Sequence, residues 1–206
     1  MKRILAFVFC LALLASLCAC GDGEPLPSSS DVTISEKDWV DVLMDDAEEL
    51  YSWFTGCNRP RCDQSSAIEL DGAVYMPVTE PGLGDTAALR GRLSELFTES
   101  IVDSLMEKVV YSGAPMFRDI GGTLYFCSDV SGQVPWDIGQ RQGAVISQTD
   151  TEIIYHLELT HNYFASSYTA VCDYRLILGE DGQWRFASFR LPALLIAEQM
   201  FQDSSE

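Results

Sequence analysis

The sequence predicts a single α+β domain in which N-terminal helices pack on one curved antiparallel sheet. Apolar residues recur every three or four positions in the first half of the chain, whereas short alternating runs separated by turn signals follow Pro115. Such segregation of helices and strands is typical of α+β folds. A chain of 206 residues is long enough for one domain with its own core. We expect this domain over residues 35–195, followed by a C-terminal tail, 196–206.

The chain begins with the pattern of an export signal. Lys2 and Arg3 precede an apolar stretch that ends in Leu17-Cys18-Ala19-Cys20. A leucine three places before a cysteine, and an alanine directly before it, resemble the lipobox of bacterial lipoproteins. We therefore expect residues 1–19 to be a cleaved signal peptide and Cys20 to be lipidated. The protein would then lie outside the cytoplasmic membrane on a lipid anchor, because two acyl chains anchor firmly.

A plain secretory signal and a membrane span are the alternatives for this segment. The 17 residues from Ile4 to Cys20 fall short of the roughly 20 that a spanning helix needs. A soluble secreted product would not need a cysteine at the cleavage point. Cys18 is a poorer lipidation site because the bulky Leu17 precedes it. Gly, Pro and Ser then dominate residues 21–33, so we expect a flexible spacer within the segment 20–34.

Three helices are expected before the strands. Ser35 and Asp38 form a candidate capping box for a helix over residues 36–55, and Gly56 is a good stop. Asp85 or Thr86 caps a second helix, and a third short helix follows Thr98. Apolar stripes mark their buried faces: Val40, Leu43, Met44, Ala47, Leu50, Tyr51 and Phe54 in the first, Leu89, Leu93, Leu96 and Phe97 in the second, and Ile101, Val102, Leu105 and Met106 in the third.

Paired apolar runs around turn residues predict the strands. Asp71-Gly72 is the strongest short hairpin signal, and Gly121-Gly122 and Asp181-Gly182 act similarly. A long loop is expected over residues 128–142. The expected strand pairs are 67–70 with 73–78, 116–120 with 123–127, 144–148 with 152–159, and 169–178 with 183–191.

The formal net charge of −18 limits the possible partners. An acidic protein is repelled by nucleic acid and by anionic lipid headgroups. It suits a basic protein partner or a cationic surface, although solubility alone also explains such a charge. We expect no nucleic-acid partner.

Four cysteines lie beyond the signal and lipidation site: Cys57, Cys62, Cys127 and Cys172. An even number outside the membrane suggests disulfides, with three possible pairings. Cys57 and Cys62 could close a small loop after the first helix. Zinc is a weaker alternative because the first pair has four intervening residues where zinc sites commonly have two, and the second pair is scattered. We expect no metal site.

Motifs for catalysis are weak throughout. Gly82, Gly84 and Ala87 match a dinucleotide-binding pattern, but a hairpin strand precedes them in place of the first strand of a βαβ unit. A turn leading into a helix explains them better. His156 and His161 are five positions apart near a strand and would therefore lie on opposite faces. A cysteine–histidine pair from Cys127 or Cys172 with His156 has no local support. We expect no enzyme activity, catalytic residue or cofactor.

The order of several aromatic and turn positions resembles the IseA-type DL-endopeptidase inhibitors and their lipoprotein relatives in Gram-positive bacteria. The similarity covers most of residues 36–190. The residues that carry it are Tyr51-Ser52-Trp53-Phe54, Val74-Tyr75-Met76-Pro77-Val78, Gly82, Leu89 to Leu93, Glu95 to Asp103, and Gly122-Thr123-Leu124-Tyr125. The lipid anchor and the cysteines at 57 and 62 depart from the family pattern.

This resemblance implies a cystatin-like fold and a role in restraining cysteine-dependent NlpC/P60 cell-wall hydrolases. The partner would be such an endopeptidase near the membrane. We expect the loop 128–142 to bind it, with Asp129 and Asp137 steering a basic partner and Trp136 as an aromatic anchor, although Trp136 could equally cap the core. The alternative is a ligand-binding or scaffold lipoprotein with an NTF2-like fold, whose pocket or core would contain Tyr111, Phe117, Tyr125, Tyr155 and Phe164.

Overall fold

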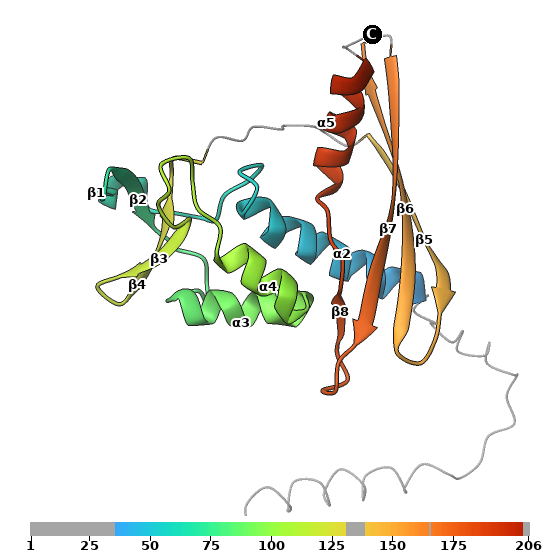
Figure 1. Ribbon diagram of the computed structural model, residues 1–206, viewed down its shortest axis with the longest axis horizontal. Coiled ribbons are helices and arrows are strands. Elements are labelled where there is room, and N and C mark those ends of the chain that lie inside the picture. The colour runs from blue at the N-terminus through green and yellow to red at the C-terminus, as the bar shows by residue number, and fades with distance from the viewer. Residues whose placement is uncertain (1–35, 131–138, 165, 204–206) are drawn as a thin grey trace, which may run out of the picture. The chain divides into compact units, whose positions relative to one another are not determined.

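A computed structural model describes residues 36–130, 139–164 and 166–203, with side chains described from residue 39 (Figure 1). Within these ranges, strands form two four-stranded antiparallel sheets with the orders β1-β2-β4-β3 and β5-β6-β7-β8. The α+β class is therefore confirmed. The expected single curved sheet is wrong, because the first two hairpins pair with each other and not with the later strands.

The first sheet joins two hairpins that are distant in sequence. Asp71 and Gly72 both adopt positive φ, 55° and 76°, as a two-residue hairpin loop between β1 and β2 requires. The two hairpins meet where Tyr75 of β2 pairs with Cys127 of β4. The strands of this sheet are β1 (Ile68–Leu70), β2 (Ala73–Pro77), β3 (Phe117–Ile120) and β4 (Thr123–Cys127).

The second sheet is built around the long hairpin of β6 (Glu152–Tyr163) and β7 (Ser166–Leu178). Its edges are β5 (Gln140–Gln148) and β8 (Trp184–Phe186). Burial alternates along β6, from Ile153 to His161, so one face of the strand lies on the core. The strands β5, β6 and β7 extend beyond their predicted bounds because pairing between neighbours continues where the apolar alternation fades.

Helices α2 (Glu36–Trp53), α3 (Thr86–Leu96) and α4 (Glu99–Met106) agree with the sequence prediction. The Asp85 carboxylate accepts a hydrogen bond from the Ala88 amide at 2.7 Å and so caps α3. Thr98 is the N-cap residue of α4, but its side chain makes no capping hydrogen bond to a backbone amide of that helix. A single turn of 3₁₀ helix, η1 (Gln64–Ser66), precedes β1.

A further helix, α5 (Pro192–Asp203), occupies much of the predicted C-terminal tail, 196–206. Pro192 is its first residue, where a missing amide proton costs no helical hydrogen bond. Leu195, Ile196 and Met200 are buried, and α5 packs on β7 and β6 (Figure 1). The tail prediction is corrected as far as Asp203, since these residues belong to the folded domain.

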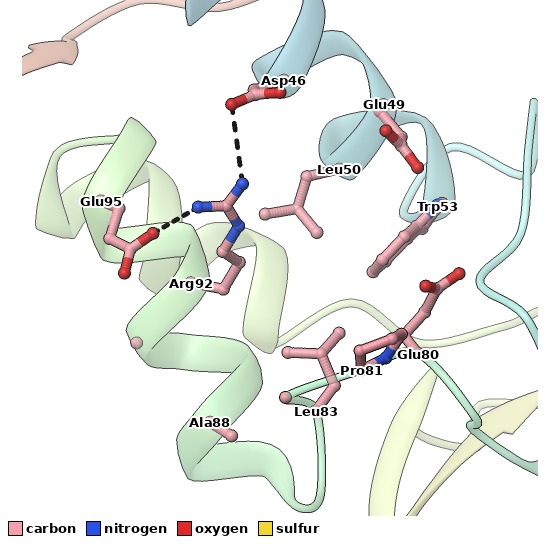
Figure 2. Close-up of a pocket in the computed structure, with 12 residues that line it drawn as sticks. Asp46, Glu49, Leu50, Trp53, Glu80, Pro81, Leu83, Ala88, Arg92 and Glu95 are labelled. Atoms are coloured by element: carbon pink, nitrogen blue, oxygen red, sulfur yellow. Dashed lines mark hydrogen bonds and ion pairs between the residues drawn. The ribbon is translucent and has the colours of Figure 1, made fainter.

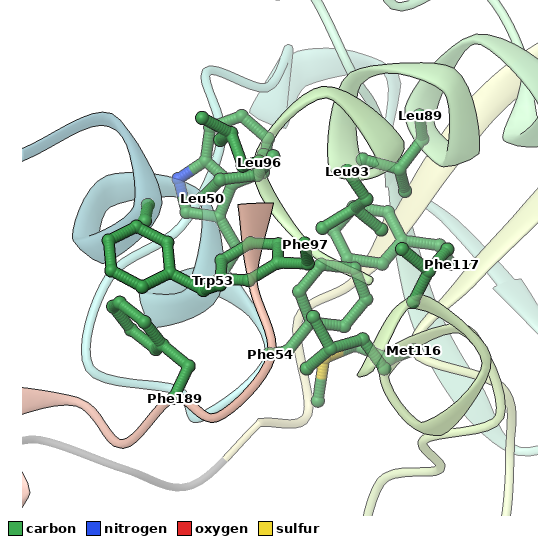
Figure 3. Packing of buried hydrophobic residues seen from close by; sticks show 14 of the residues in the cluster. Leu50, Trp53, Phe54, Leu89, Leu93, Leu96, Phe97, Met116, Phe117 and Phe189 are labelled. Atoms are coloured by element: carbon green, nitrogen blue, oxygen red, sulfur yellow. The ribbon is translucent and has the colours of Figure 1, made fainter. Parts of the chain in front are cut away.

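Aromatic side chains connect the helices to both sheets in one hydrophobic core (Figure 3). The ring of Phe54, which follows α2, lies 5.0 Å from that of Phe117 in β3. Phe97, which follows α3, lies 5.2 Å from Phe189, which follows β8. Buried residues along both α2 and α3 hold these helices in this core, and other faces of the two helices form the walls of the site described next.

Candidate functional site

A cleft of about 430 Å³ lies between α2, α3 and the turn that precedes α3 (Figure 2). One wall is formed by α2, the opposite wall by α3, and residues 80–83 close one end. The described lining residues are Asp46, Glu49, Leu50, Trp53, Glu80, Pro81, Gly82, Leu83, Ala88, Gly91, Arg92 and Glu95.

Helical spacing explains why these residues share a cleft. Positions 46, 49, 50 and 53 of α2 follow the spacing i, i+3, i+4 and i+7, which places side chains on one face of a helix. Positions 88, 91, 92 and 95 of α3 have the same spacing. Two such faces opposite each other produce an elongated groove.

The floor of the cleft is apolar and its α3 wall is low. Leu50, Trp53 and Leu83 are less than a tenth exposed and form the floor. Gly91 has no side chain, and a Cβ built there would meet nothing within 4 Å. The open space beside Gly91 is therefore available to an apolar group of a ligand.

Carboxylates dominate the rim. Among the described lining residues, four are carboxylic acids and one, Arg92, is a cation. The Arg92 guanidinium crosses the groove, 3.6 Å from Asp46 on α2 and 2.5 Å from Glu95 on its own helix (Figure 2). Arg92 thus offsets one of the two negative charges in this arm of the cleft.

The other arm contains Glu49 and Glu80. Glu80 is fixed in place because its Oε1 accepts the Arg61 amide proton at 2.8 Å, and the Arg61 Nε lies 3.7 Å away. Glu49 is exposed on α2. In the view of Figure 2, Trp53 lies between these two carboxylates. This arm combines negative charge with an aromatic surface, which is the chemistry that receives a cation.

A second polar cluster fastens α2 to the second sheet. The buried Tyr155 of β6 donates a hydrogen bond to Asp41, and Arg141 of β5 forms ion pairs with Glu48 at 2.8 Å and Asp45 at 3.1 Å. Burial raises the pKa of Glu48 to about 7, while Arg141 lowers it and Asp45 raises it to smaller extents. In helical register the cluster lies on the side of α2 adjacent to the cleft residues, since Asp45 and Glu49 are one turn apart, and its contacts are internal to the fold.

The predicted partner-binding residues are not assembled into a described site. The Asp129 carboxylate accepts the Val74 amide proton at 3.2 Å, so it is bound to the backbone of β2. Ser128 adds to this contact, because its amide donates to the Val74 carbonyl at 2.8 Å. Trp136, Asp137 and the predicted lipidation site Cys20 lie outside the described residues.

Among the described residues, Cys57, Cys62, Cys127 and Cys172 carry free thiols. Burial raises the pKa of Cys62 to about 11, which keeps its thiol protonated at neutral pH. The pairing of Cys57 with Cys62 stays a prediction. Within the described chain, no group of three or more histidine, cysteine or acidic residues is arranged to hold a metal ion.

The histidines considered for catalysis and the glycines considered for dinucleotide binding have contacts or positions that the fold explains. His156 hydrogen-bonds Asp173 on the neighbouring strand at 2.6 Å, whereas His161 is buried, as their odd separation predicted. Gly82 and Gly84 belong to an irregular segment before α3 that follows an antiparallel sheet, in agreement with the turn interpretation. In the part of the chain that the structure describes, none of the helices combines the length and apolarity needed to cross a membrane.

The aromatic residues considered as a pocket lining are dispersed. Tyr111 and Phe164 are almost fully exposed, whereas Phe117 and Tyr155 are buried in the core. They therefore do not line a common cavity, because their side chains belong to different environments.

The chain matches no protein-family model and no curated protein sequence. The resemblance to the IseA-type inhibitors therefore stays a prediction. The cleft is defined by the structure alone.

Sequence reasoning missed the cleft residues. The acidic face of α2 was visible in the sequence, and Asp46 and Glu49 belong to it. The acidic positions 80 and 95 lie on segments whose distance from α2 is set by helix packing, which the sequence pattern does not encode. A glycine at position 91, inside a helical pattern, was the one local signal of a close approach or an open groove.

Proposed function

We propose that this chain is a membrane-anchored extracytoplasmic protein that binds and restrains a cell-wall hydrolase of the NlpC/P60 DL-endopeptidase type. The cleft between α2 and α3 supports a protein-binding role, because it offers an apolar floor inside an acidic rim. Interfaces combine buried apolar contacts with charged rims in this way. The hydrolase class comes from the sequence resemblance, and the cleft supplies the surface that such a partner would engage.

The predicted anchor narrows the choice of partner. A flexible spacer over residues 21–33 would have a root-mean-square reach of about 20 Å from a lipidated Cys20. A hydrolase close to the membrane would therefore meet a raised local concentration of the domain, whereas one deep in the wall would be out of range. The membrane contact in this proposal is made by the lipid.

Muropeptide release tests this proposal directly. The full chain, purified in mild detergent, is mixed with a panel of NlpC/P60 endopeptidases on purified peptidoglycan, and the soluble fragments are quantified. We expect at least one membrane-proximal enzyme to be slowed in proportion to the inhibitor concentration. Unchanged release across the panel would reject the inhibitor role.

A cellular experiment tests the anchor. Cys20→Ala should release the protein from the membrane and weaken control of wall turnover, because the local concentration falls. Fractionation and labelled-wall release are the readouts. Wall turnover that stays the same after release would argue against a membrane-proximal target.

A ligand-binding or scaffold lipoprotein with an NTF2-like fold is the alternative. The cleft volume of about 430 Å³ favours it, since small-molecule pockets commonly occupy this range. Thermal shift of the full chain against a library of small cationic and amphipathic metabolites would detect such a ligand. A specific small ligand together with unaltered hydrolase rates would favour this alternative.

A further inference from the structure

The two arms of the cleft differ in what they leave for a ligand. Arg92 is already held between Asp46 and Glu95, so both carboxylates of this arm contact a cation. In the other arm Arg61 lies 3.7 Å from Glu80 and its side chain is 78% exposed, so this cation is held less closely. Glu49 and Glu80 on the other arm face each other across Trp53 in Figure 2. An additional positive charge in this arm would lie in the part of the cleft that Glu49 and Glu80 line.

Glu80 can serve a ligand without releasing its internal contact. One carboxylate oxygen accepts the Arg61 amide proton. A carboxylate offers about four acceptor positions over its two oxygens, so further donors can bind. Its side chain is 17% exposed, which lowers solvent competition for a bound cation.

We propose that the cleft binds a basic amphipathic peptide segment of the partner protein. One lysine or arginine side chain of that segment lies between Glu49 and Glu80, and its apolar side chains lie over Leu50 and the open space beside Gly91. This deepens the proposed function and rests on it for the identity of the partner.

Charge complementarity selects this occupant. Even when Arg61 is added to the lining residues, four carboxylates face two guanidinium groups. An acidic segment would be repelled, and a purely apolar one would leave the rim carboxylates without new partners. A basic side chain next to apolar ones satisfies both the rim and the floor.

Fluorescence anisotropy with a labelled synthetic peptide of alternating lysine and leucine tests the inference on the full chain in mild detergent. The matched probe has glutamate in place of lysine, and unlabelled spermidine serves as a competitor. We expect the lysine peptide to bind, more weakly as salt is added, and the glutamate peptide not to bind. Spermidine as effective a competitor as the unlabelled peptide would reject a peptide ligand.

Variants distinguish peptide binding in the cleft from attraction of the peptide to the negative net charge of the protein. Glu49→Gln with Glu80→Gln should weaken binding about tenfold or more, because each removes a charged contact at the site. Gly91→Leu should weaken it similarly without changing any charge, since its side chain fills the groove. Glu69→Gln, an exposed carboxylate on β1, is the control and should bind as the wild type does.

The peptide-binding and hydrolase assays together distinguish failure of this inference from failure of the proposed function. If the double variant and Gly91→Leu both bind the peptide as tightly as the wild type does, the cleft assignment is overturned, whatever the hydrolase assays show. Peptide binding that depends on Glu49, Glu80 and Gly91, with no hydrolase inhibited, would support the ligand chemistry and remove the hydrolase as partner. Circular dichroism of each variant checks that the fold is retained.

Discussion

The hydroxyl of Tyr155 lies directly against Gly143 on the neighbouring strand, and a side chain at position 143 would occupy the same space. Tyr155 cannot move aside easily, because it is fully buried and its hydroxyl donates a hydrogen bond to Asp41 of α2. The missing side chain at position 143 thus allows β5 and β6 to pair while α2 is fastened to the sheet.

Gly143→Ala should therefore destabilise the domain by about 2 kcal/mol or more, because the added methyl group overlaps a fixed ring. Gly91→Ala is the matched control, since a Cβ there meets nothing within 4 Å. That change should stabilise α3 by about 0.5–1 kcal/mol through helix propensity. Urea unfolding of both variants measures the difference. Equal effects at the two glycines would contradict the account of Tyr155.

Glu48 should make the stability of the domain depend on pH. Its pKa rises from 4.5 to about 7 on folding, chiefly through burial. Between these values the folded chain binds more protons than the unfolded chain, so the stabilising contribution is full below pH 4.5 and is lost as the pH rises through 7. The whole shift corresponds to about 3 kcal/mol at most.

Glu48→Gln removes this titration. The variant should gain stability relative to the wild type between pH 5 and pH 8, as measured by urea unfolding at both values. Glu158→Gln, an exposed carboxylate on β6, is the control and should show little change. A stability difference between wild type and Glu48→Gln that is the same at both pH values would contradict a raised pKa.

Arg92→Ala should strengthen binding of the lysine–leucine peptide several-fold at low salt. The change frees Asp46 and Glu95 and makes the cleft more negative, while loss of an exposed ion pair costs about 0.5 kcal/mol of stability or less. Arg175→Ala removes the same charge from the second sheet, where Arg175 pairs with Glu152, and serves as control. Equal gains in peptide affinity in both variants would mean that net charge alone determines binding. A loss of peptide affinity in Arg92→Ala would contradict this prediction and would make Arg92 part of the binding surface.

Local signals in the sequence were sufficient for most elements. Asp85 caps α3, Thr98 precedes α4, and Asp71-Gly72 forms the first hairpin, because capping and turn chemistry act over a few residues. The division into two sheets depends on the pairing of Tyr75 with Cys127, which are distant in the chain. Alternation along a strand shows which face is buried and does not show which strand lies beside it.

Helix α5 was missed because Leu191 to Ala197 is a continuous apolar run, which fits a buried strand as well as a helix.

The site was less accessible to sequence reasoning than the fold. The cleft was missed because it needs α2 and α3 to pack with particular faces outward. The acidity of its rim was visible at Asp46 and Glu49, but their closeness to Glu80 and Arg92 is a property of the packed structure.

The most direct measurement of the central claim is hydrolase inhibition by the Glu49→Gln/Glu80→Gln double variant. Wild type, double variant and the Glu69→Gln control are titrated, as full chains in mild detergent, against a membrane-proximal NlpC/P60 endopeptidase, with muropeptide release as the readout. We expect the control to inhibit like the wild type and the double variant to need about tenfold more protein. Equal inhibition by all three would contradict the claim that the cleft between α2 and α3 holds the partner.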